Sequence, residues 1–332
     1  MKKVLIVGTG GIGKRHIRGF LKTGRAKLWV VEPVEEKRAE VLREYAIEGG
    51  YADLARADLP SFDLAVICAP AHVHVPLGLK CAEAGVPFLT EKPLAVTMEG
   101  VEALLAKVKE KGIEARVGYV RRSALELIEL RRQILAGKIG DLRMAYMNAS
   151  QEFTKYRPDY QTTYYAKAAM GGGCILDAAS HLIDVAIWIF GEPVEVCSMY
   201  DRLHLQGVEG EDCALITIRF KSGCLVQLSL NQFQKPNANT LEVIGTRGNL
   251  VLDMSTVKFA DNDSGEWESK NYMEGLRPME AHEARFAFQA NLMLDLLEGK
   301  PSHLSTLEEA RLSLKVALAA KLSDREKRII RI

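Results

Sequence analysis

Three ionisable side chains share one face of a strongly apolar helical pattern in the middle of the chain. Asp177, His181 and Asp184 stand at positions i, i+4 and i+7, a spacing that places them on one stripe of a helix. The residues from Cys174 to Phe190 are otherwise largely apolar, so this helix is expected to be buried. Buried ionisable groups are costly unless they are paired or used. Asp177 could hydrogen-bond His181 and hold its imidazole ready as a general base.

Two other interpretations of this stripe remain open. His181 could be a core histidine with satisfied hydrogen bonds, and Asp177 could cap the N-terminus of the helix. The Asp-x-x-x-His spacing can also chelate a metal ion, but no third ligand of a suitable type stands nearby, and we predict no metal site. The glycines Gly171, Gly172 and Gly173 precede the helix and suit a backbone that comes close to a ligand.

A lysine provides a second candidate for chemistry. Glu91-Lys92-Pro93 follows the predicted strand over residues 87–90, and open α/β sheets bind ligands at the carboxyl ends of their strands. Pro93 could be cis, which would aim Lys92 into a cleft. A cation there would stabilise negative charge on a substrate oxygen. The alternative is a Lys-Pro turn on the surface.

A glycine-rich loop lies near the N-terminus. Residues 8–13 read G-T-G-G-I-G, follow an apolar strand pattern over 4–7 and open a helical pattern over 12–22, which is the context that a dinucleotide-binding G-x-G-x-x-G motif requires. Glycines permit the tight turn, the approach of a pyrophosphate and close packing of helix on strand, and the helix N-terminus supplies N–H donors. The alternative is a glycine-rich turn without a ligand. The loop predicts a dinucleotide site formed by Gly8, Gly10, Gly11, Ile12 and Gly13.

An acidic residue accompanies this loop. Glu32 lies 19 residues after Gly13, at the end of the second predicted strand. A carboxylate there can accept both ribose hydroxyls of the adenosine, and it would repel a 2′-phosphate. We therefore expect NAD rather than NADP, a preference that the nearby Arg38 keeps moderate.

The segment from Phe153 to Lys167 is rich in tyrosine, lysine and arginine. Tyrosine faces suit the C–H surfaces of sugar rings, and their hydroxyls suit polar substituents, while an arginine could meet a carboxylate. The alternative is a loop at a subunit interface, where tyrosine is also enriched. The residues expected to line the substrate pocket, beside Lys92, Asp177 and His181, are Arg121, Tyr156, Arg157 and Tyr164.

The elements that must position these residues follow two patterns. Up to about residue 120, strand patterns alternate with helical patterns, which predicts an α/β domain with a doubly wound parallel sheet, the Rossmann arrangement. Thr97 is expected to cap one helix, and Ser123 with Glu126 to form a capping box at the start of the next. We place the boundary of this dinucleotide-binding domain at residues 1–122.

The second half of the chain changes character. Residues 141–261 are mostly strand-like, with hairpin patterns such as 216–228, and two helical patterns follow at about 280–298 and 306–322. This predicts an α+β domain over residues 123–332 with a large, mostly antiparallel open sheet. Its C-terminal helices could pack back on the first domain.

Composition restricts the class of protein. The chain has 332 residues with 44 Lys and Arg against 43 Asp and Glu, a net charge of +1, so it carries no global footprint for nucleic acid or an anionic membrane. No apolar run approaches the roughly 20 residues of a membrane span, and the N-terminus lacks the apolar region of a secretory signal. The six cysteines form no CxxC pair and suggest packing residues in a reducing compartment, the cytoplasm.

Taken together, these motifs resemble the glucose–fructose oxidoreductase and inositol dehydrogenase family (Gfo/Idh/MocA), and the resemblance covers essentially the whole chain. Glu-Lys-Pro combined with Asp-x-x-x-His is specific, whereas the glycine loop alone is not. The residues that carry the resemblance are Gly8, Gly10, Gly13, His16, Pro70, His74, Glu91-Lys92-Pro93, Gly118, Arg121-Arg122, the Gly137-to-Gly140 turn, Gly172-Gly173, Asp177, His181, Asp184, Trp188 and the Gly245-Thr246-x-Gly248 turn.

The resemblance implies a dehydrogenase that oxidises a secondary alcohol of a sugar or cyclitol with NAD or NADP. By position, Lys92, Asp177 and His181 correspond to the family's catalytic residues. His181 would take the hydroxyl proton as hydride leaves for the nicotinamide, Lys92 would polarise the oxygen, and Asp177 would bind substrate or orient His181. The residues expected beside the cofactor, in addition to the glycine loop and Glu32, are Pro70, His74, Glu91 and Lys92.

The implied partners are a small carbohydrate or cyclitol and further copies of the chain, as a homodimer or homotetramer through the C-terminal sheet, with no nucleic acid and no membrane. Two other functions remain open. Some relatives use bound NAD to cleave glycosides by transient oxidation and elimination, without net NADH. A non-catalytic NAD-binding regulator is also conceivable, but it predicts loss of Lys92 or His181, and both are present.

Overall fold

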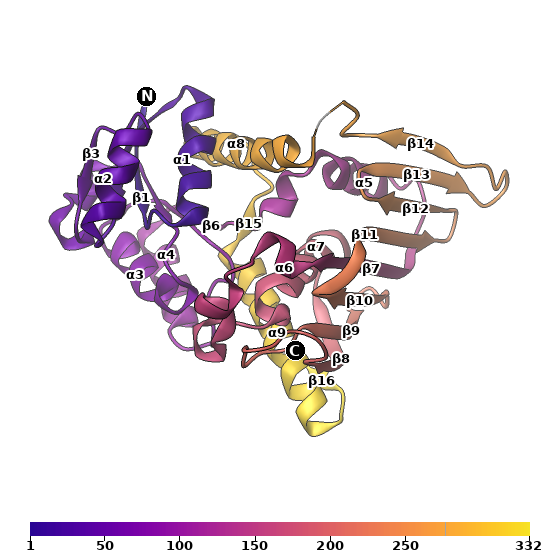
Figure 1. Ribbon diagram of the computed structural model, residues 1–332. Helices are drawn as coiled ribbons and strands as arrows, with labels where there is room; N and C mark the ends of the chain where they lie inside the picture. Colours follow the sequence, from indigo (N-terminus) through magenta and orange to yellow (C-terminus); the bar gives the residue numbers. More distant parts are fainter. Residues whose placement is uncertain (276) are drawn as a thin grey trace. The chain divides into compact units, whose positions relative to one another are not determined.

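The computed structural model describes residues 1–275 and 277–332, and the chain divides into two compact units. The first unit comprises residues 1–123 and 276–308, and the second comprises residues 124–275 and 309–332. Each unit is built around its own sheet, and the elements of both are labelled in Figure 1.

The first unit contains a seven-stranded sheet in the order β15-β6-β5-β4-β1-β2-β3. Neighbouring strands are parallel, except that the short β15 pairs antiparallel with β6. The predicted doubly wound parallel sheet is therefore confirmed. The strands are β1 (Lys2–Val7), β2 (Ala26–Val31), β3 (Gly49–Tyr51), β4 (Leu64–Ile67), β5 (Phe88–Thr90), β6 (Ala115–Val117) and β15 (Ser305–Thr306).

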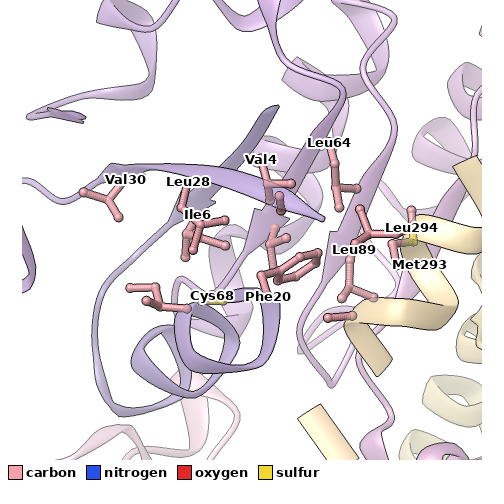
Figure 2. Packing of buried hydrophobic residues seen from close by; sticks show 14 of the residues in the cluster. Val4, Ile6, Phe20, Leu28, Val30, Leu64, Cys68, Leu89, Met293 and Leu294 are labelled. Atoms are coloured by element: carbon pink, nitrogen blue, oxygen red, sulfur yellow. The ribbon is translucent and has the colours of Figure 1, made fainter. Parts of the chain in front are cut away.

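Helices cover this sheet and complete its core. They are α1 (Gly11–Thr23), α2 (Glu35–Glu44), α3 (His74–Glu83), α4 (Val101–Lys111) and α8 (Pro278–Leu297). Although α8 is remote in sequence, it lies beside α1, the indigo and orange helices of Figure 1. Figure 2 shows Phe20 of α1 with Met293 and Leu294 of α8 in the same apolar layer as the side chains of β1, β2, β4 and β5.

The second unit contains a nine-stranded sheet in the order β14-β13-β12-β11-β7-β10-β9-β8-β16. All pairs are antiparallel apart from β10 and β7, as the sequence predicted. The strands are β7 (Leu142–Glu152), β8 (Pro193–Asp201), β9 (Cys213–Phe220), β10 (Leu225–Asn231), β11 (Phe233–Gly245), β12 (Gly248–Asp253), β13 (Thr256–Asp261), β14 (Glu268–Asn271) and β16 (Ile330–Arg331).

Burial alternates along the central strands of this sheet, so one face is packed and the other is open. The buried helix α7 packs on β7 and β10. The helices of this part of the chain are α5 (Leu125–Leu135), α6 (Phe153–Tyr156), α7 (Ser180–Phe190) and α9 (Leu307–Glu326).

Two predicted helix caps are wrong. α4 begins at Val101 after Gly100, and the Thr97 hydroxyl instead accepts the N–H of Glu99 at 3.3 Å. α5 begins at Leu125 without a side-chain cap, and Ser123 belongs to the preceding 3₁₀ turn. Short hydroxyl side chains form hydrogen bonds with nearby backbone groups in turns as readily as at helix starts. The sequence positions of Thr97 and Ser123 therefore could not distinguish a turn from a helix cap.

The expectation that no segment is apolar enough for a membrane span needs correction. Residues Ala168–Phe190 pass such a test by length and composition, with a mean hydropathy of 1.6 in their most apolar window. However, 83% of that window is buried inside the structure. A segment that is mostly buried within its own protein leaves little surface for lipid, which is typical of a core element.

Candidate active site

The glycine loop joins β1 to α1 and is shaped by two close approaches. Gly8 has a positive φ of 95°, and a Cβ on it would lie 3.0 Å from the carbonyl oxygen of Cys68. A Cβ on Gly13 would lie 2.1 Å from the carbonyl oxygen of Gly8. Any larger residue at Gly13 would therefore push α1 away from the turn, which is the packing reason for the last glycine of the motif.

The middle of the loop is open. A Cβ on Gly10 or Gly11 would meet nothing within 4 Å in the described chain. Gly10 is the N-cap of α1, no side chain in the described residues caps this helix, and its first turn holds no acidic residue. Exposed N–H groups and the positive end of the helix dipole fit an anionic pyrophosphate. Ile12 is half-buried against the core beneath this turn.

Glu32 lies immediately after β2 and contacts Thr9 of the glycine loop. Its side chain is almost buried, and its carboxylate accepts hydrogen bonds from the main-chain N–H and the hydroxyl of Thr9 at 3.0 and 2.9 Å. Arg38 donates to the main-chain oxygen of Glu32 at 2.7 Å. The acidic residue and the glycine loop thus belong to one hydrogen-bonded unit.

The carboxylate of Glu91 makes hydrogen bonds within the protein. Nε2 of His16, on α1, donates to Oε1 of Glu91 at 2.7 Å, and both side chains are buried. The main-chain N–H of Lys92 donates to the other oxygen at 3.2 Å. A Cβ on Gly118 would lie 2.9 Å from Oε1, so this glycine makes room for the carboxylate. The His16–Glu91 pair fixes the end of β5 against α1, a role that spacing alone did not reveal.

Lys92 is half-buried and is joined to Pro93 by a cis peptide bond, as the sequence suggested. His74 lies next to this turn, and its two ring nitrogens are each 2.8 Å from a main-chain oxygen, that of Pro93 and that of Ala69. Burial lowers the pKa of His74. Because both nitrogens face the protein, any contribution of His74 to cofactor binding acts through the two loops that it holds. Pro70, the residue after Ala69, is exposed.

In the second unit, Asp177 and His181 do not share one regular α-helix. Residues Ile175–Ala179 form a π-helical turn, and α7 begins only at Ser180. Asp177 lies within the π turn, and both Asp177 and His181 are half-buried, whereas Asp184 is fully buried. The predicted stripe therefore holds two accessible members. π turns are frequent at functional sites, but nothing in the residue spacing signalled this one.

Tyr164 is brought to the same place. Its hydroxyl donates to Oδ1 of Asp177 at 2.6 Å, while 42% of the tyrosine remains exposed. Tyr156 is also exposed, and its hydroxyl accepts a hydrogen bond from Asn237 at 2.8 Å. Arg157 is exposed at the end of α6. Of the predicted substrate residues in this unit, Tyr164 and Asp177 are thus shown in direct contact.

Two of the glycines before the π turn are required by the packing of the protein itself. A Cβ on Gly172 would lie 2.3 Å from the carbonyl oxygen of Tyr165, and a Cβ on Gly173 would lie 2.7 Å from Oε1 of Glu211. Glu211 was not predicted. Its buried carboxylate accepts the N–H of Ile175 at 3.0 Å and pairs with Lys321 at 3.1 Å, so an internal ion pair anchors the start of the helical segment that carries Asp177.

Arg121, the remaining predicted substrate residue, belongs to the first unit. It is half-buried in the 3₁₀ turn Val120–Ser123, directly after β6.

Cys174, next to the π turn, is buried, and this burial raises the pKa of its thiol well above the ordinary value. A thiol of that kind is unreactive, so the candidate site offers oxygen and nitrogen groups for chemistry.

Comparison with known proteins supports both halves of this description. Residues 2–119 match a family model described as an oxidoreductase family with an NAD-binding Rossmann fold, and residues 127–251 match the GFO/IDH/MocA C-terminal domain. A myo-inositol 2-dehydrogenase of Thermotoga maritima is 25% identical over 342 residues, which cover 99% of this chain and 98% of that protein. A scyllo-inositol 2-dehydrogenase (NAD(+)) of Bacillus subtilis is 27% identical over 256 residues, covering 74% and 72%.

Solved structures agree in fold. A levoglucosan dehydrogenase in complex with NADH and levoglucosan superposes with a TM-score of 0.88 at 23% identity, covering 100% of this chain and 99% of that one. An oxidoreductase from Agrobacterium radiobacter in complex with NAD⁺, L-tartaric acid and magnesium gives 0.87 at 18% identity, covering 99% and 98%. The two matched domain models belong to the same family and account for most of the chain, so this protein is an NAD-binding oxidoreductase of the GFO/IDH/MocA family.

Proposed function

We propose that this protein is an NAD-dependent dehydrogenase that moves hydride between the nicotinamide and a secondary alcohol of a sugar, sugar derivative or cyclitol. The contact between Tyr164 and Asp177 carries this proposal. It presents an exposed tyrosine ring, a hydroxyl and a carboxylate acceptor together, which suits a ring bearing several hydroxyls. The names of the inositol and levoglucosan dehydrogenases similar to this chain support the same substrate class.

The proposed roles divide the chemistry among three side chains. Bound NAD supplies the acceptor for the hydride. His181 takes the proton of the reacting hydroxyl as general base, Lys92 stabilises the negative charge on that oxygen, and Asp177 accepts a hydrogen bond from a substrate hydroxyl. The C–H electron pair leaves with the hydride, so a secondary alcohol becomes a ketone and one proton remains on the base.

Further residues complete the proposal. The substrate is bound by Arg121, Tyr156, Arg157 and Tyr164. The cofactor site is shaped by Pro70, His74, Glu91 and Lys92. Of these four residues, His74 and Glu91 act indirectly, because they hold the surrounding backbone. All six cysteines carry free thiols in the described chain, which supports a reducing, cytoplasmic location.

We also propose that copies of the chain associate through the open face of the second sheet. Met199 of β8 and Leu215 of β9 are directly paired across the strands, and they are 72% and 53% exposed. Tyr146 of β7 is 42% exposed on the same sheet. Large apolar side chains gathered on one sheet face favour contact with another protein surface.

The test incubates the purified full chain with NAD⁺ and a panel of monosaccharides, cyclitols, sugar acids and glycosides, following NADH absorbance and released products. NADH formation that His181→Ala reduces by roughly 10²–10⁴-fold supports the proposal, provided that NAD⁺ affinity is unchanged. Cleavage of a glycoside without net NADH would instead establish the redox-assisted hydrolase. A His181→Ala variant that retains full activity would remove the proposed base.

A further inference from the structure

We infer that Thr9 is a specificity-determining residue for the adenosine half of the cofactor. It fixes the carboxylate of Glu32 so that a single acceptor position remains for the ribose. This inference uses the NAD binding of the family and does not depend on the proposed substrate.

The hydrogen bonds of Glu32 are unevenly distributed over its two oxygens. Oε2 accepts two bonds, both from Thr9: the main-chain N–H at 3.0 Å and the hydroxyl at 2.9 Å. Oε1 accepts the main-chain N–H of Val34 at 3.2 Å. A carboxylate offers about four acceptor positions in all. In the described chain, Oε2 is therefore filled and Oε1 retains one position.

Burial makes this arrangement rigid. Glu32 is 7% exposed and Thr9 is 2% exposed. Hydrogen bonds to a charged oxygen are stronger than neutral ones, and a buried hydroxyl that loses its partner cannot recover it from water. Turning the carboxylate would break these bonds at once. The rotamer of Glu32 is thus set before any cofactor arrives.

One free acceptor position changes how Glu32 recognises the ribose. The adenosine ribose carries two neighbouring hydroxyls, at the 2′ and 3′ carbons, and one acceptor position takes one of them. The sequence-based expectation was that Glu32 accepts hydrogen bonds from both ribose hydroxyls. Because Thr9 occupies Oε2, we infer that Glu32 accepts only one of them. A fixed carboxylate also cannot swing away from the negative charge of a 2′-phosphate, which favours NAD⁺.

Arg38 is a nearby cation that could favour the 2′-phosphate of NADP⁺. Its guanidinium donates to the main-chain oxygen of Glu32 at 2.7 Å, so a cation lies beside the same turn. A guanidinium is well suited to a phosphate. Selectivity between NAD⁺ and NADP⁺ then depends on whether the repulsion from the Glu32 carboxylate or the attraction to the Arg38 guanidinium is stronger. Thr9 favours NAD⁺ because it holds the carboxylate in one position.

The first test compares Thr9→Val, which removes the hydroxyl at nearly constant size, with Thr9→Ser, which retains it. Dissociation constants of NAD⁺ and NADP⁺ are measured by titration calorimetry on the full chain. We expect Thr9→Val to lower the preference for NAD⁺ roughly tenfold and Thr9→Ser to leave it within about twofold. An unchanged preference in a folded Thr9→Val variant would overturn the inference.

The second test asks whether Thr9 acts through Glu32. In a Glu32→Gln background the carboxylate is absent, so Thr9→Val should no longer change the NAD⁺ to NADP⁺ ratio. A merely structural role of Thr9 would lower both affinities and leave their ratio constant. If Thr9→Val changes the ratio equally in both backgrounds, Thr9 does not act through Glu32 and the inference fails.

The third test probes the single acceptor position with 2′-deoxy-NAD⁺ and 3′-deoxy-NAD⁺. We expect one analogue to bind wild-type protein roughly tenfold more weakly than NAD⁺, and the other to bind within about twofold. Equal losses for the two analogues would show that Glu32 accepts both hydroxyls and would overturn this part of the inference. Because binding is measured directly, failure to find a turned-over sugar would not affect these outcomes.

Discussion

At the scale of single residues, the contact between Tyr164 and Asp177 is the most informative feature of the second unit. The two residues are 13 positions apart, separated by 3₁₀ turns and glycines, yet the tyrosine hydroxyl lies 2.6 Å from the carboxylate. The aspartate is thereby oriented by a side chain that is itself exposed. An acceptor held in one orientation binds a substrate hydroxyl without first being ordered.

We therefore predict that Tyr164→Phe lowers kcat/KM for the best sugar or cyclitol roughly tenfold, because Asp177 loses an orienting hydrogen bond. The affinity for NAD⁺ should not change. Steady-state kinetics with the substrate found in the panel provide the measurement. Tyr160→Phe is the matched control, since the Tyr160 ring packs against Phe153 at 6.2 Å and that packing survives the change. Equal losses in both variants would contradict an orienting role.

The sequence singles out candidate residues for the site, but it does not reveal several of their structural partners. Lys92, Asp177 and His181 are identifiable because charged groups stand out beside apolar strands and helices. Glu211 could not be found in this way, since it approaches the π turn from a different segment. Its signal was indirect: Gly173 before the helix leaves the space that the Glu211 carboxylate occupies.

At the scale of elements, an ion pair joins α1 to α8 within the first unit. Nε and Nη2 of Arg18 donate to the two carboxylate oxygens of Glu283 at 3.0 and 2.6 Å. Hydrogen bonding by Arg18 is the largest of the effects that together lower the pKa of Glu283 below its ordinary value of 4.5. This pair adds a directional contact to the apolar packing of the two helices.

The lowered pKa gives the pair a defined pH dependence. The folded state favours the ionised carboxylate, so its contribution is present above the unfolded pKa and is lost as pH falls through the lower folded pKa. We predict that Glu283→Gln lowers the free energy of unfolding by about 1 kcal/mol at neutral pH, and that the difference from wild type shrinks as the pH falls through the folded pKa of Glu283. Urea denaturation at several pH values provides the measurement.

Glu280→Gln serves as the control on the same helix. Glu280 pairs with the neighbouring Arg277, and the two side chains are 45% and 82% exposed, so water screens this pair and the replacement should change stability little. A loss in Glu283→Gln that persists unchanged at low pH would show that the charge of Glu283 is not responsible.

At the scale of the whole molecule, the open face of the nine-stranded sheet is the surface that we propose for association between copies of the chain. Met199 and Leu215 face each other across β8 and β9. We predict that Met199→Lys combined with Leu215→Lys shifts the protein to the monomer, because two charges would be buried in the proposed interface. Light scattering after size exclusion measures the mass. Met254→Lys, at an exposed residue between β12 and β13, is the control and should leave the mass unchanged. A double variant of wild-type mass would exclude this face.

The sequence by itself determined the doubly wound sheet, the glycine loop and the candidates Lys92, Asp177 and His181, because strand and helix periodicity and short motifs are local properties. The tertiary structure decided what distant segments do to one another. It placed α8 against α1 in the first unit and Glu211 at the start of the π turn. It also filled one oxygen of Glu32 with bonds from Thr9. Such pairings depend on how the folded chain fills space, and no local spacing encodes them.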